Sequence, residues 1–593
     1  MGVDEMNLRW SLKELYPSFD SKRFKGDLKR LDQKISQINQ LSEEGLDNTD
    51  NSVLQAEEYI TLLTEIYTLF ELLFNFAQLT LSVDAKNQQA LKVIESLEEK
   101  EVLLTKPSVK FQKWIAALDG LEEVIVSSKL LTEHSFFLQE LAKESKYLLS
   151  EEQEVLIAKM SSTASKAWEK LYDLLTSTLL VKIELDGVEK QLPLPVIRNM
   201  AYEDEQALRR KAYQAELNSY KQIEDSIAAA LNGIKGEVLT ISEQRGYQSP
   251  LEKTLLDSRM ETETLEVMFK AIKEYLPLFH NYYRKKAELL GYQAGLPFYE
   301  LFAPIGEAKM RFTYDQARKF IVGNFRSFSD DLAAYADNAF AKHWIDAEPR
   351  SGKRGGAFCS NIHPISESRI LANFTGSLSD VLTLAHELGH GYHGSCLVDE
   401  SIINSDYPMP LAETASIFCE TIIQQATLEK ASQEEKLTIL ESSISDAGQV
   451  IVDIYSRYLF ESEVFERRKN SSLAVEELKE MMIDAQKKAY GRGLDHDCLH
   501  PYMWLCKPHY YSAGLNYYNF PYAFGLLFAK GIYAQYLEKG QGFIEEYNSL
   551  LAVSGKESVV NVAKTIGINV NSIDFWRASL DIIKQDIEEF LKL

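Results

Sequence analysis

Apolar residues recur at intervals of three and four positions over most of this 593-residue chain, and prolines rarely interrupt the pattern. That periodicity places apolar side chains along one face of a helix. It predicts helices in seven segments: 54–104, 131–178, 202–246, 262–290, 313–342, 433–470 and 473–490. Because strand signals are sparse, the sequence predicts an all-α fold, mostly helical, with a small β component.

Two segments carry strand signals. Residues 180–194, "LVKIELDGVEKQLPL", alternate apolar and polar side chains around Asp186-Gly187, which predicts a β-hairpin. Residues 368–375, "SRILANFT", form a second candidate strand just ahead of a histidine cluster. The chain changes character near residue 195, after the hairpin and its prolines. We therefore predict an N-terminal helical domain at 1–195 and a second domain, carrying the histidine cluster, at 196–593.

The acidic balance excludes some partners. A net charge of −24 and a pI near 5.0 argue against nucleic-acid binding, which needs a basic surface, and against docking on anionic lipid. The most apolar run, 69–83, is interrupted by Glu71, Asn75 and Gln78, so we predict a buried helix and not a membrane span. The beginning of the chain shows no secretory signal, and the five cysteines form no CxxC pair. These features predict a protein of the reducing cytoplasm.

The stretch "LTLAHELGHGYHGS", 382–395, contains His386-Glu387-Leu388-Gly389-His390. Positions i and i+4 of a helix lie on one face, so both imidazoles can reach one ion, and Glu387 can reach a water on that ion. Ser377 and Asp380 provide a helix-start signal upstream, and Gly389, a poor helix former, suggests close packing at that turn. Only ten histidines occur in the chain, which argues against three of them gathering here by chance.

Catalytic zinc usually takes a third protein ligand. His393 follows His390 by only three residues and does not fit the metzincin spacing, so we interpret it as a neighbour or a substrate contact. The segment "YPMPLAETASIFCETIIQQ", 407–425, offers Glu413 and Glu420, which are seven residues apart and so share a helix face. One could bind the metal while the other orients a histidine; the spacing alone does not rank them.

These motifs resemble those of a known enzyme family. "HELGHGYH" followed by "PLAETASIFCE" is similar to the zinc metallopeptidases of the oligoendopeptidase F and thimet oligopeptidase family, and the start of the chain and its hairpin resemble the oligoendopeptidase F branch. The resemblance implies one zinc ion per chain bound by His386, His390 and Glu413, with Glu387 as the general base. It leaves Glu420 as a carboxylate that contacts one of the metal-binding side chains. It also implies an elongated, two-lobed helical body with a deep channel that admits short unfolded peptides.

The resemblance extends to "HYYSAGLNYYNFPYAFG", 509–525, where the family supplies a histidine and tyrosines that stabilise the oxyanion. We assign this role to His509, Tyr518 and Tyr522; the alternative is an aromatic core helix. We also expect the strand at 369–375 to pair with the substrate backbone. The chain is thus predicted to be a cytoplasmic zinc-dependent oligoendopeptidase that acts on short peptides.

The same sequence features allow two other functions. A helical zinc carboxypeptidase can use the same five-residue motif, but it would require a free substrate terminus. A catalytically inactive peptide-binding scaffold could share the fold, although such a protein would have no need to keep His386, Glu387, His390 and Glu413 together.

Overall fold

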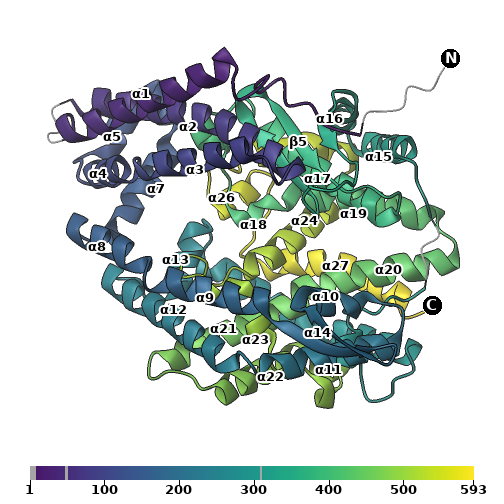
Figure 1. Cartoon of the computed structure of the whole chain (residues 1–593). Helices are drawn as coiled ribbons and strands as arrows, with labels where there is room; N and C mark the ends of the chain where they lie inside the picture. The colour runs from purple at the N-terminus through teal and green to yellow at the C-terminus, as the bar shows by residue number, and fades with distance from the viewer. Residues whose placement is uncertain (1–7, 47–50, 307–309) are drawn as a thin grey trace. The chain divides into compact units, whose positions relative to one another are not determined.

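The computed structural model describes residues 8–46, 51–306 and 310–593. Helices make up most of these residues, as the periodicity predicts (Figure 1). The chain divides into two compact units, which we describe separately. Unit 1 comprises the described residues of Met1–Lys146, Met310–Ala426 and Gln535–Ile568, and unit 2 comprises those of Tyr147–Lys309, Thr427–Ala534 and Asn569–Leu593. The units divide the chain at positions other than residue 195, so the domain boundary there stays a prediction.

Unit 1 begins with helices that enclose an apolar core. Helix α1 (Lys22–Glu44) buries Phe24, Leu31, Ile35 and Ile38, at the spacing that one helix face requires, and packs on α2 (Figure 1). Further helices of the unit are α2 (Ser52–Val83), α3 (Gln88–Val102), α4 (Thr105–Ala116), α5 (Leu121–Val126), α6 (Lys129–Glu133), α7 (Ser135–Glu144), α15 (Tyr314–Phe328), α16 (Asp330–Ala341), α25 (Ile544–Ala552) and α26 (Val559–Lys564).

Helix α2 is the one described helix that is long and apolar enough to span a membrane. About half of its most apolar window is buried, and its side chains Leu69, Leu73 and Phe76 belong to the core cluster of unit 1. The helix therefore lies as a core helix does, in agreement with the interpretation of the interrupted apolar run.

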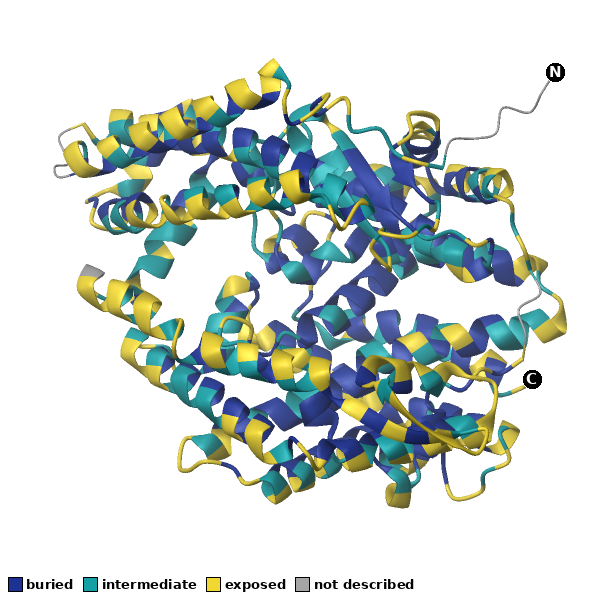
Figure 2. Cartoon of the chain, viewed as in Figure 1, coloured by how far each residue is buried: buried dark blue, intermediate teal, exposed yellow. Residues whose placement is uncertain are grey.

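A three-stranded sheet in unit 1 leads to the histidine cluster. Its strands are β3 (Ile345–Asp346), β4 (Phe358–Ile362) and β5 (Glu367–Leu371), in the order β3-β5-β4. Strand β5 pairs in parallel with β3 and antiparallel with β4, so it is the central strand and is largely buried (Figure 2). The expected pairing of this segment with substrate is wrong, because neighbouring strands occupy both edges of β5.

The hairpin in unit 2 forms as the alternation predicts. Strands β1 (Leu180–Leu185) and β2 (Val188–Pro193) pair antiparallel on either side of Asp186 and Gly187. Both turn residues have positive φ, 54° and 76°, which a two-residue hairpin turn with the twist of the strands requires. Asp186 is tolerated in the turn because a residue with a short polar side chain can adopt the left-handed conformation.

Unit 2 is otherwise helical. Its helices are α8 (Glu151–Ser161), α9 (Ser165–Thr178), α10 (Leu194–Asn199), α11 (Gln206–Tyr220), α12 (Glu224–Arg245), α13 (Pro250–Asp257), α14 (Thr262–Leu289), α20 (Gln433–Gly448), α21 (Ile454–Arg468), α22 (Val475–Tyr490), α23 (Met503–Cys506) and α27 (Ile573–Phe590). Helix α24 (Phe520–Lys539) begins in unit 2 and ends in unit 1.

Candidate metal centre

The histidine motif lies on α17 (Leu378–Cys396), as the sequence predicts. Ser377 caps this helix: its hydroxyl accepts the backbone N–H of Asp380, and the Asp380 side chain accepts the N–H of Ser377. The apolar face of α17 is buried, so the orientation of the helix about its axis is fixed by packing. His386 and His390 consequently lie on one side of the helix, with ring centroids 4.9 Å apart.

Gly389 explains how a second segment approaches these histidines. A Cβ built at this position would lie 2.5 Å from the backbone oxygen of Ala415 and 2.6 Å from the Cα of Ser416. The two residues belong to α19 (Thr414–Lys430), which follows the short helix α18 (Met409–Ala412). The close packing expected at this turn is confirmed: only glycine lets the backbone of α19 come so near to α17.

Glu413, between α18 and α19, faces both histidines. Its Oε2 lies 3.2 Å from Nε2 of His386 and 3.5 Å from Nε2 of His390. One ligand atom from each residue lies within 4.8 Å of the others, a spacing that one metal ion can bridge. The Ser416 hydroxyl donates to the same Oε2 of Glu413 at 2.7 Å and orients the carboxylate.

Glu420, seven residues beyond Glu413 and within α19, contacts the other side of the His386 ring. Its Oε2 lies 3.1 Å from Nδ1 of that ring, whereas Glu413 faces Nε2. The geometry therefore distinguishes the two glutamates, which the spacing did not. Glu413 shares a potential ion with both imidazoles, and Glu420 holds the ring of His386 in place through its other nitrogen.

The charges of the cluster are strongly perturbed. Burial would lower the pKa of His386, but its hydrogen bonds with Glu413 and Glu420 outweigh burial and raise the pKa to about 10. Burial would raise the pKa of Glu413, but the hydrogen bond with His386 and the nearby histidines lower it to about 2. Burial lowers the pKa of His390 to about 4. Without an ion, a proton thus resides on His386, and an ion that binds Nε2 must displace it.

Glu387 points into the same space. Burial raises the pKa of this carboxyl to about 7, while the backbone N–H of Cys359 on β4 donates to it and opposes the shift. Among the described residues, its Oε2 has no hydrogen-bond partner although it is buried. A buried carboxylate oxygen left unpaired beside three ligand atoms fits a metal centre whose water would occupy that position. The residues present therefore fit a zinc ion.

These groups line a cavity of about 300 Å³. Its walls are Ala357, Phe358, Cys359, Asn361, His386, Glu387, His390, Tyr407 and Glu413. The wall residues from β4 were missed in the sequence, because "FCSNI" shows no clear alternation of apolar and polar side chains. Tyr407 was missed although it begins the segment that contains Glu413. Its phenol hydrogen-bonds with Asn361 and so joins that segment to β4.

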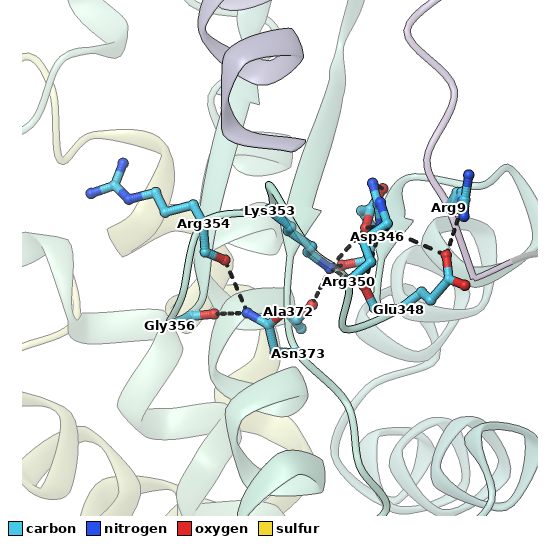
Figure 3. A network of polar contacts seen from close by, with 9 residues as sticks. All are labelled: Arg9, Asp346, Glu348, Arg350, Lys353, Arg354, Gly356, Ala372 and Asn373. Atoms are coloured by element: carbon cyan, nitrogen blue, oxygen red, sulfur yellow. Dashed lines mark hydrogen bonds and ion pairs between the residues drawn. The ribbon is translucent and has the colours of Figure 1, made fainter. Parts of the chain in front are cut away.

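The loop that leads into β4 is held by a polar network (Figure 3). The buried ammonium of Lys353 donates to three backbone carbonyls, those of Asp346, Glu348 and Ala372. Asn373 Nδ2 donates to the carbonyls of Arg354 and Gly356 at 3.1 and 2.9 Å. Gly356 has a φ of 78°, which accounts for a glycine there, and the space around it is open.

His393 lies behind the cavity wall. It is fully buried, its Nε2 pairs with the Ser554 hydroxyl at 2.8 Å, and its ring stacks on Tyr407 at 4.0 Å. The interpretation of His393 as a neighbour and not a ligand agrees with this position, whereas its burial excludes a substrate contact.

Unit 2 holds the other candidate residues. The His509 ring lies 5.4 Å from Tyr518, which lies 5.9 Å from Tyr522 in the first turn of α24. All three are half-buried, whereas the neighbouring tyrosines of the segment, Tyr510, Tyr511 and Tyr517, are buried in the core. The aromatic segment is thus partly core, as the alternative held. The oxyanion role of its half-buried members stays a prediction.

A buried ion pair fixes this segment. Glu461 on α21 accepts the Lys235 ammonium at 2.8 Å and the backbone N–H of Tyr517 at 3.1 Å. Lys235 also donates to the Asn516 side chain at 2.9 Å. Tyr517 has a φ of 52°, a strained value for a bulky residue, and these bonds to its own and the preceding residue hold the turn in place.

The chain resembles known peptidases over most of its length. A model of peptidase family M3 matches residues 199–582, and a model described as Oligopeptidase F matches residues 114–180. The chain is 24% identical over 482 residues to Oligopeptidase PepF of Bacillus subtilis, covering 80% of this chain and 71% of that protein. It is 24% identical over 608 residues to an oligoendopeptidase F homolog of Lactococcus lactis, covering 99% and 97% of the two chains.

Solved structures show the same fold. A Chlamydophila abortus protein of known structure superposes with a TM-score of 0.84 at 21% identity, covering 99% of this chain and 98% of that chain. Oligoendopeptidase-F from Enterococcus faecium gives a TM-score of 0.70 at 19% identity, with 95% and 99% covered. The fold is shared with these solved structures, and the matching family model defines the class of protein, a metallopeptidase. Because the family model covers most of its length, the chain belongs to peptidase family M3. It is a metalloendopeptidase that acts on peptides, as the sequence predicts.

Proposed function

We propose that this metalloendopeptidase is a zinc-dependent oligoendopeptidase that hydrolyses internal bonds of short unfolded peptides in the cytoplasm. His386, His390 and Glu413 would bind the zinc ion, with Glu420 orienting His386. The relatives named oligopeptidase and oligoendopeptidase F support the substrate class. The observation that carries the proposal is the buried, unpaired Oε2 of Glu387 beside the three ligand atoms.

His386, His390 and Glu413 would hold a zinc ion, which would supply a water of lowered pKa and a Lewis acid for the scissile carbonyl. Glu387 Oε2 accepts the proton of the attacking water and later delivers it to the leaving amine. Its other interaction, with the Cys359 backbone N–H, keeps the carboxylate aimed into the cavity. Burial keeps its pKa near 7, where a base can both take up and release a proton.

The edge strand β4 is the surface we assign to the substrate backbone. In the described part of the chain, β4 pairs with β5 on one side and with no strand on the other. Its residues Phe358 and Cys359 line the cavity. A peptide added along this edge would lie across the metal centre. We further propose that His509, Tyr518 and Tyr522 donate hydrogen bonds to the oxyanion; removing one such donor typically costs about 2.7–4 kcal/mol.

The Glu387→Gln variant tests the catalytic role, because glutamine keeps the shape of the side chain and cannot accept the proton. Zinc content should match that of the wild type, while kcat falls by several orders of magnitude. Glu400→Gln, on a glutamate that pairs with Lys556 outside the cavity, is the matched control and should retain activity. Normal hydrolysis by Glu387→Gln would contradict the assignment.

Peptides blocked at both ends separate the alternatives. An endopeptidase cleaves them internally, whereas a carboxypeptidase leaves them intact. An inactive scaffold would bind such peptides with no cleavage by the zinc-loaded wild type. Cleavage of a blocked peptide that is suppressed in Glu387→Gln would exclude both alternatives.

A further inference from the structure

Unit 2 contains a second cluster of metal-ligand side chains, which the proposed function does not use. Glu216 comes from α11, Cys506 from the end of α23, and His500 from the segment just before α23. They offer one oxygen, one nitrogen and one sulfur atom, all within 4.8 Å of one another. All three residues are buried. In the sequence they are up to 290 residues apart, so no spacing motif announces them.

The spacing of the three donors suits a tetrahedral ion. Glu216 Oε1 lies 3.6 Å from His500 Nε2 and 3.7 Å from Cys506 Sγ. Zinc bonds of about 2.0 Å to oxygen or nitrogen and about 2.3 Å to sulfur place tetrahedral ligands roughly 3.3–3.7 Å apart. The corresponding separations in the unit 1 cluster, from Glu413 to its two histidines, are 3.2 and 3.5 Å. The second cluster is therefore preformed to a similar degree.

His500 is a buried imidazole without a hydrogen bond of normal length in the described structure; its polar contact is an ion pair with Glu216. Its exposed fraction is 2%, and in the described structure neither ring nitrogen makes a hydrogen bond. The distance of 3.6 Å to Glu216 is too long for one. The ring is surrounded by the aromatic side chains of Tyr213, Tyr220 and Phe298. Leaving a buried polar group unpaired is unfavourable, and an ion on Nε2 would remove that penalty for this nitrogen.

The surroundings orient the ligands. The Tyr220 hydroxyl donates to Glu216 Oε1 at 2.6 Å and lies 3.0 Å from Cys506 Sγ. Arg198 Nε lies 3.3 Å from the same carboxylate oxygen. Such contacts from groups outside the ligand set fix carboxylate and thiol orientations in metal sites. When the cluster contains no ion, the Glu216 carboxylate is held by Arg198 and by the Tyr220 hydroxyl.

The cluster can supply two negative charges to a divalent ion. Burial would raise the pKa of Glu216, but His500, Arg198 and Tyr220 outweigh it and lower the pKa to about 2, so the carboxylate is ionised. Burial raises the pKa of the Cys506 thiol to about 12, so without an ion it is protonated. Binding converts the thiol to a thiolate and releases one proton to solvent. The carboxylate and the thiolate then supply two negative charges to the ion, while Arg198 stays beside the carboxylate.

An ion can reach this cluster. The three residues lie on the wall of a cavity of about 670 Å³ within unit 2, whose lining also includes Tyr213, Phe298 and Lys507. The cavity supplies both an entry path and room for a water as the fourth ligand. We propose that Glu216, His500 and Cys506 bind a second divalent ion of the zinc class, separate from the one in unit 1.

This ion would join α11 to the part of the chain just before His509, because Cys506 precedes His509 by three residues. The ion would hold three ligands from two distant parts of the chain, so its binding free energy would add to the folding free energy of unit 2. The inference does not depend on the proposed function, since its test measures the metal and not hydrolysis.

Metal analysis of the purified full chain tests the proposal. Zinc-saturated wild type should retain two equivalents after gel filtration, and the His386→Ala/His390→Ala double variant should retain one. Replacement of zinc by Co²⁺ gives an independent reading, because a thiolate ligand produces an intense near-ultraviolet charge-transfer band and the unit 1 cluster has no thiolate. The band should appear in both proteins.

Two variants and a control complete the test. Cys506→Ser and His500→Gln should each lose one equivalent of zinc, and Cys506→Ser should also lose the band. Cys498→Ser, on a half-buried cysteine outside the cluster, should keep both. One equivalent in the wild type, none in the double histidine variant and no thiolate band in the cobalt protein would overturn the proposal. Because these wild-type and double-variant measurements need no change at the second cluster, a folding defect in Cys506→Ser leaves the test intact.

Discussion

Replacing Gly389 by alanine tests how closely α17 and α19 must approach for the metal centre to form. The added Cβ would meet the Ala415 oxygen at 2.5 Å and the Ser416 Cα at 2.6 Å, whereas ordinary contacts begin near 3.5 Å. These contacts are with backbone, so no rotamer change relieves them. The start of α19 must move away by roughly 1 Å, and Glu413 lies two residues before Ala415 on the same backbone.

That displacement separates Glu413 from His386 and His390. A misplacement of about 1 Å at a catalytic centre can lower the rate about 10²-fold, so kcat/KM should fall by roughly that factor, together with zinc affinity. Overpacking costs about 1–3 kcal/mol of stability, and the better helix propensity of alanine recovers at most about 1 kcal/mol. Net destabilisation is expected, visible as a lower thermal midpoint of the zinc-free protein.

Gly323→Ala is the matched control, because Gly323 lies in the middle of α15, also in unit 1, and a Cβ there meets nothing within 4 Å. It should raise the thermal midpoint and leave kcat/KM unchanged. The measurements are hydrolysis of an end-blocked fluorogenic peptide, competition for zinc with a chelator, and thermal unfolding. If Gly389→Ala bound zinc and cleaved peptide like the wild type, the close approach of the two helices would not control the centre.

Three further outcomes follow from the structure. Glu420→Ala removes the partner of His386 Nδ1 and should weaken zinc binding about 10–100-fold, measured by chelator competition, while Glu413 stays in place. Glu71, whose pKa burial raises to about 7 against the hydrogen bond it accepts from the His363 N–H, binds more protons in the folded than in the unfolded state between about pH 4.5 and 7, so its contribution to stability falls as pH rises through that window. Glu71→Gln keeps the acceptor without the charge and should therefore unfold at a higher temperature than the wild type at pH 8 but not at pH 4.5. Arg369, fully buried and hydrogen-bonded at several atoms, should be intolerant of methionine: loss of this cation leaves buried acceptors unpaired and lowers the thermal midpoint.

Local patterns in the sequence predict much of unit 1's metal centre. The i, i+4 histidines need only a helix, and Ser377 and Asp380 indicate where that helix begins. Gly389 indicates close packing before its partner is known. The hairpin at 180–194 is equally local, since the turn residues Asp186 and Gly187 determine its register. Each of these inferences depends on residues within a few positions of one another.

The remaining features depend on contacts between distant segments. Nothing in "FCSNI" predicts that the Cys359 N–H meets Glu387, or that β4 and not β5 forms the sheet edge. Glu413 and Glu420 have equivalent spacing, and only the packing of α19 on α17 assigns them to opposite nitrogens of His386. Tertiary packing decides such questions because pairing partners and helix–helix approach are not encoded in local periodicity.

Tyr407 forms one wall of the small cavity and stacks on His393, so a substitution at His393 could change the position of that wall. The phenol forms the cavity face, the imidazole lies parallel to it at an angle of 8°, and Ser554 anchors the imidazole. Replacing His393 with a smaller side chain would leave a space into which the Tyr407 phenol could tilt. The cavity would become larger without a change in any metal-ligand atom. An inhibitor with an added group that fills the enlarged cavity would then act on the engineered peptidase alone. The contribution of this peptidase in a living cell could thus be separated from that of every other peptidase present.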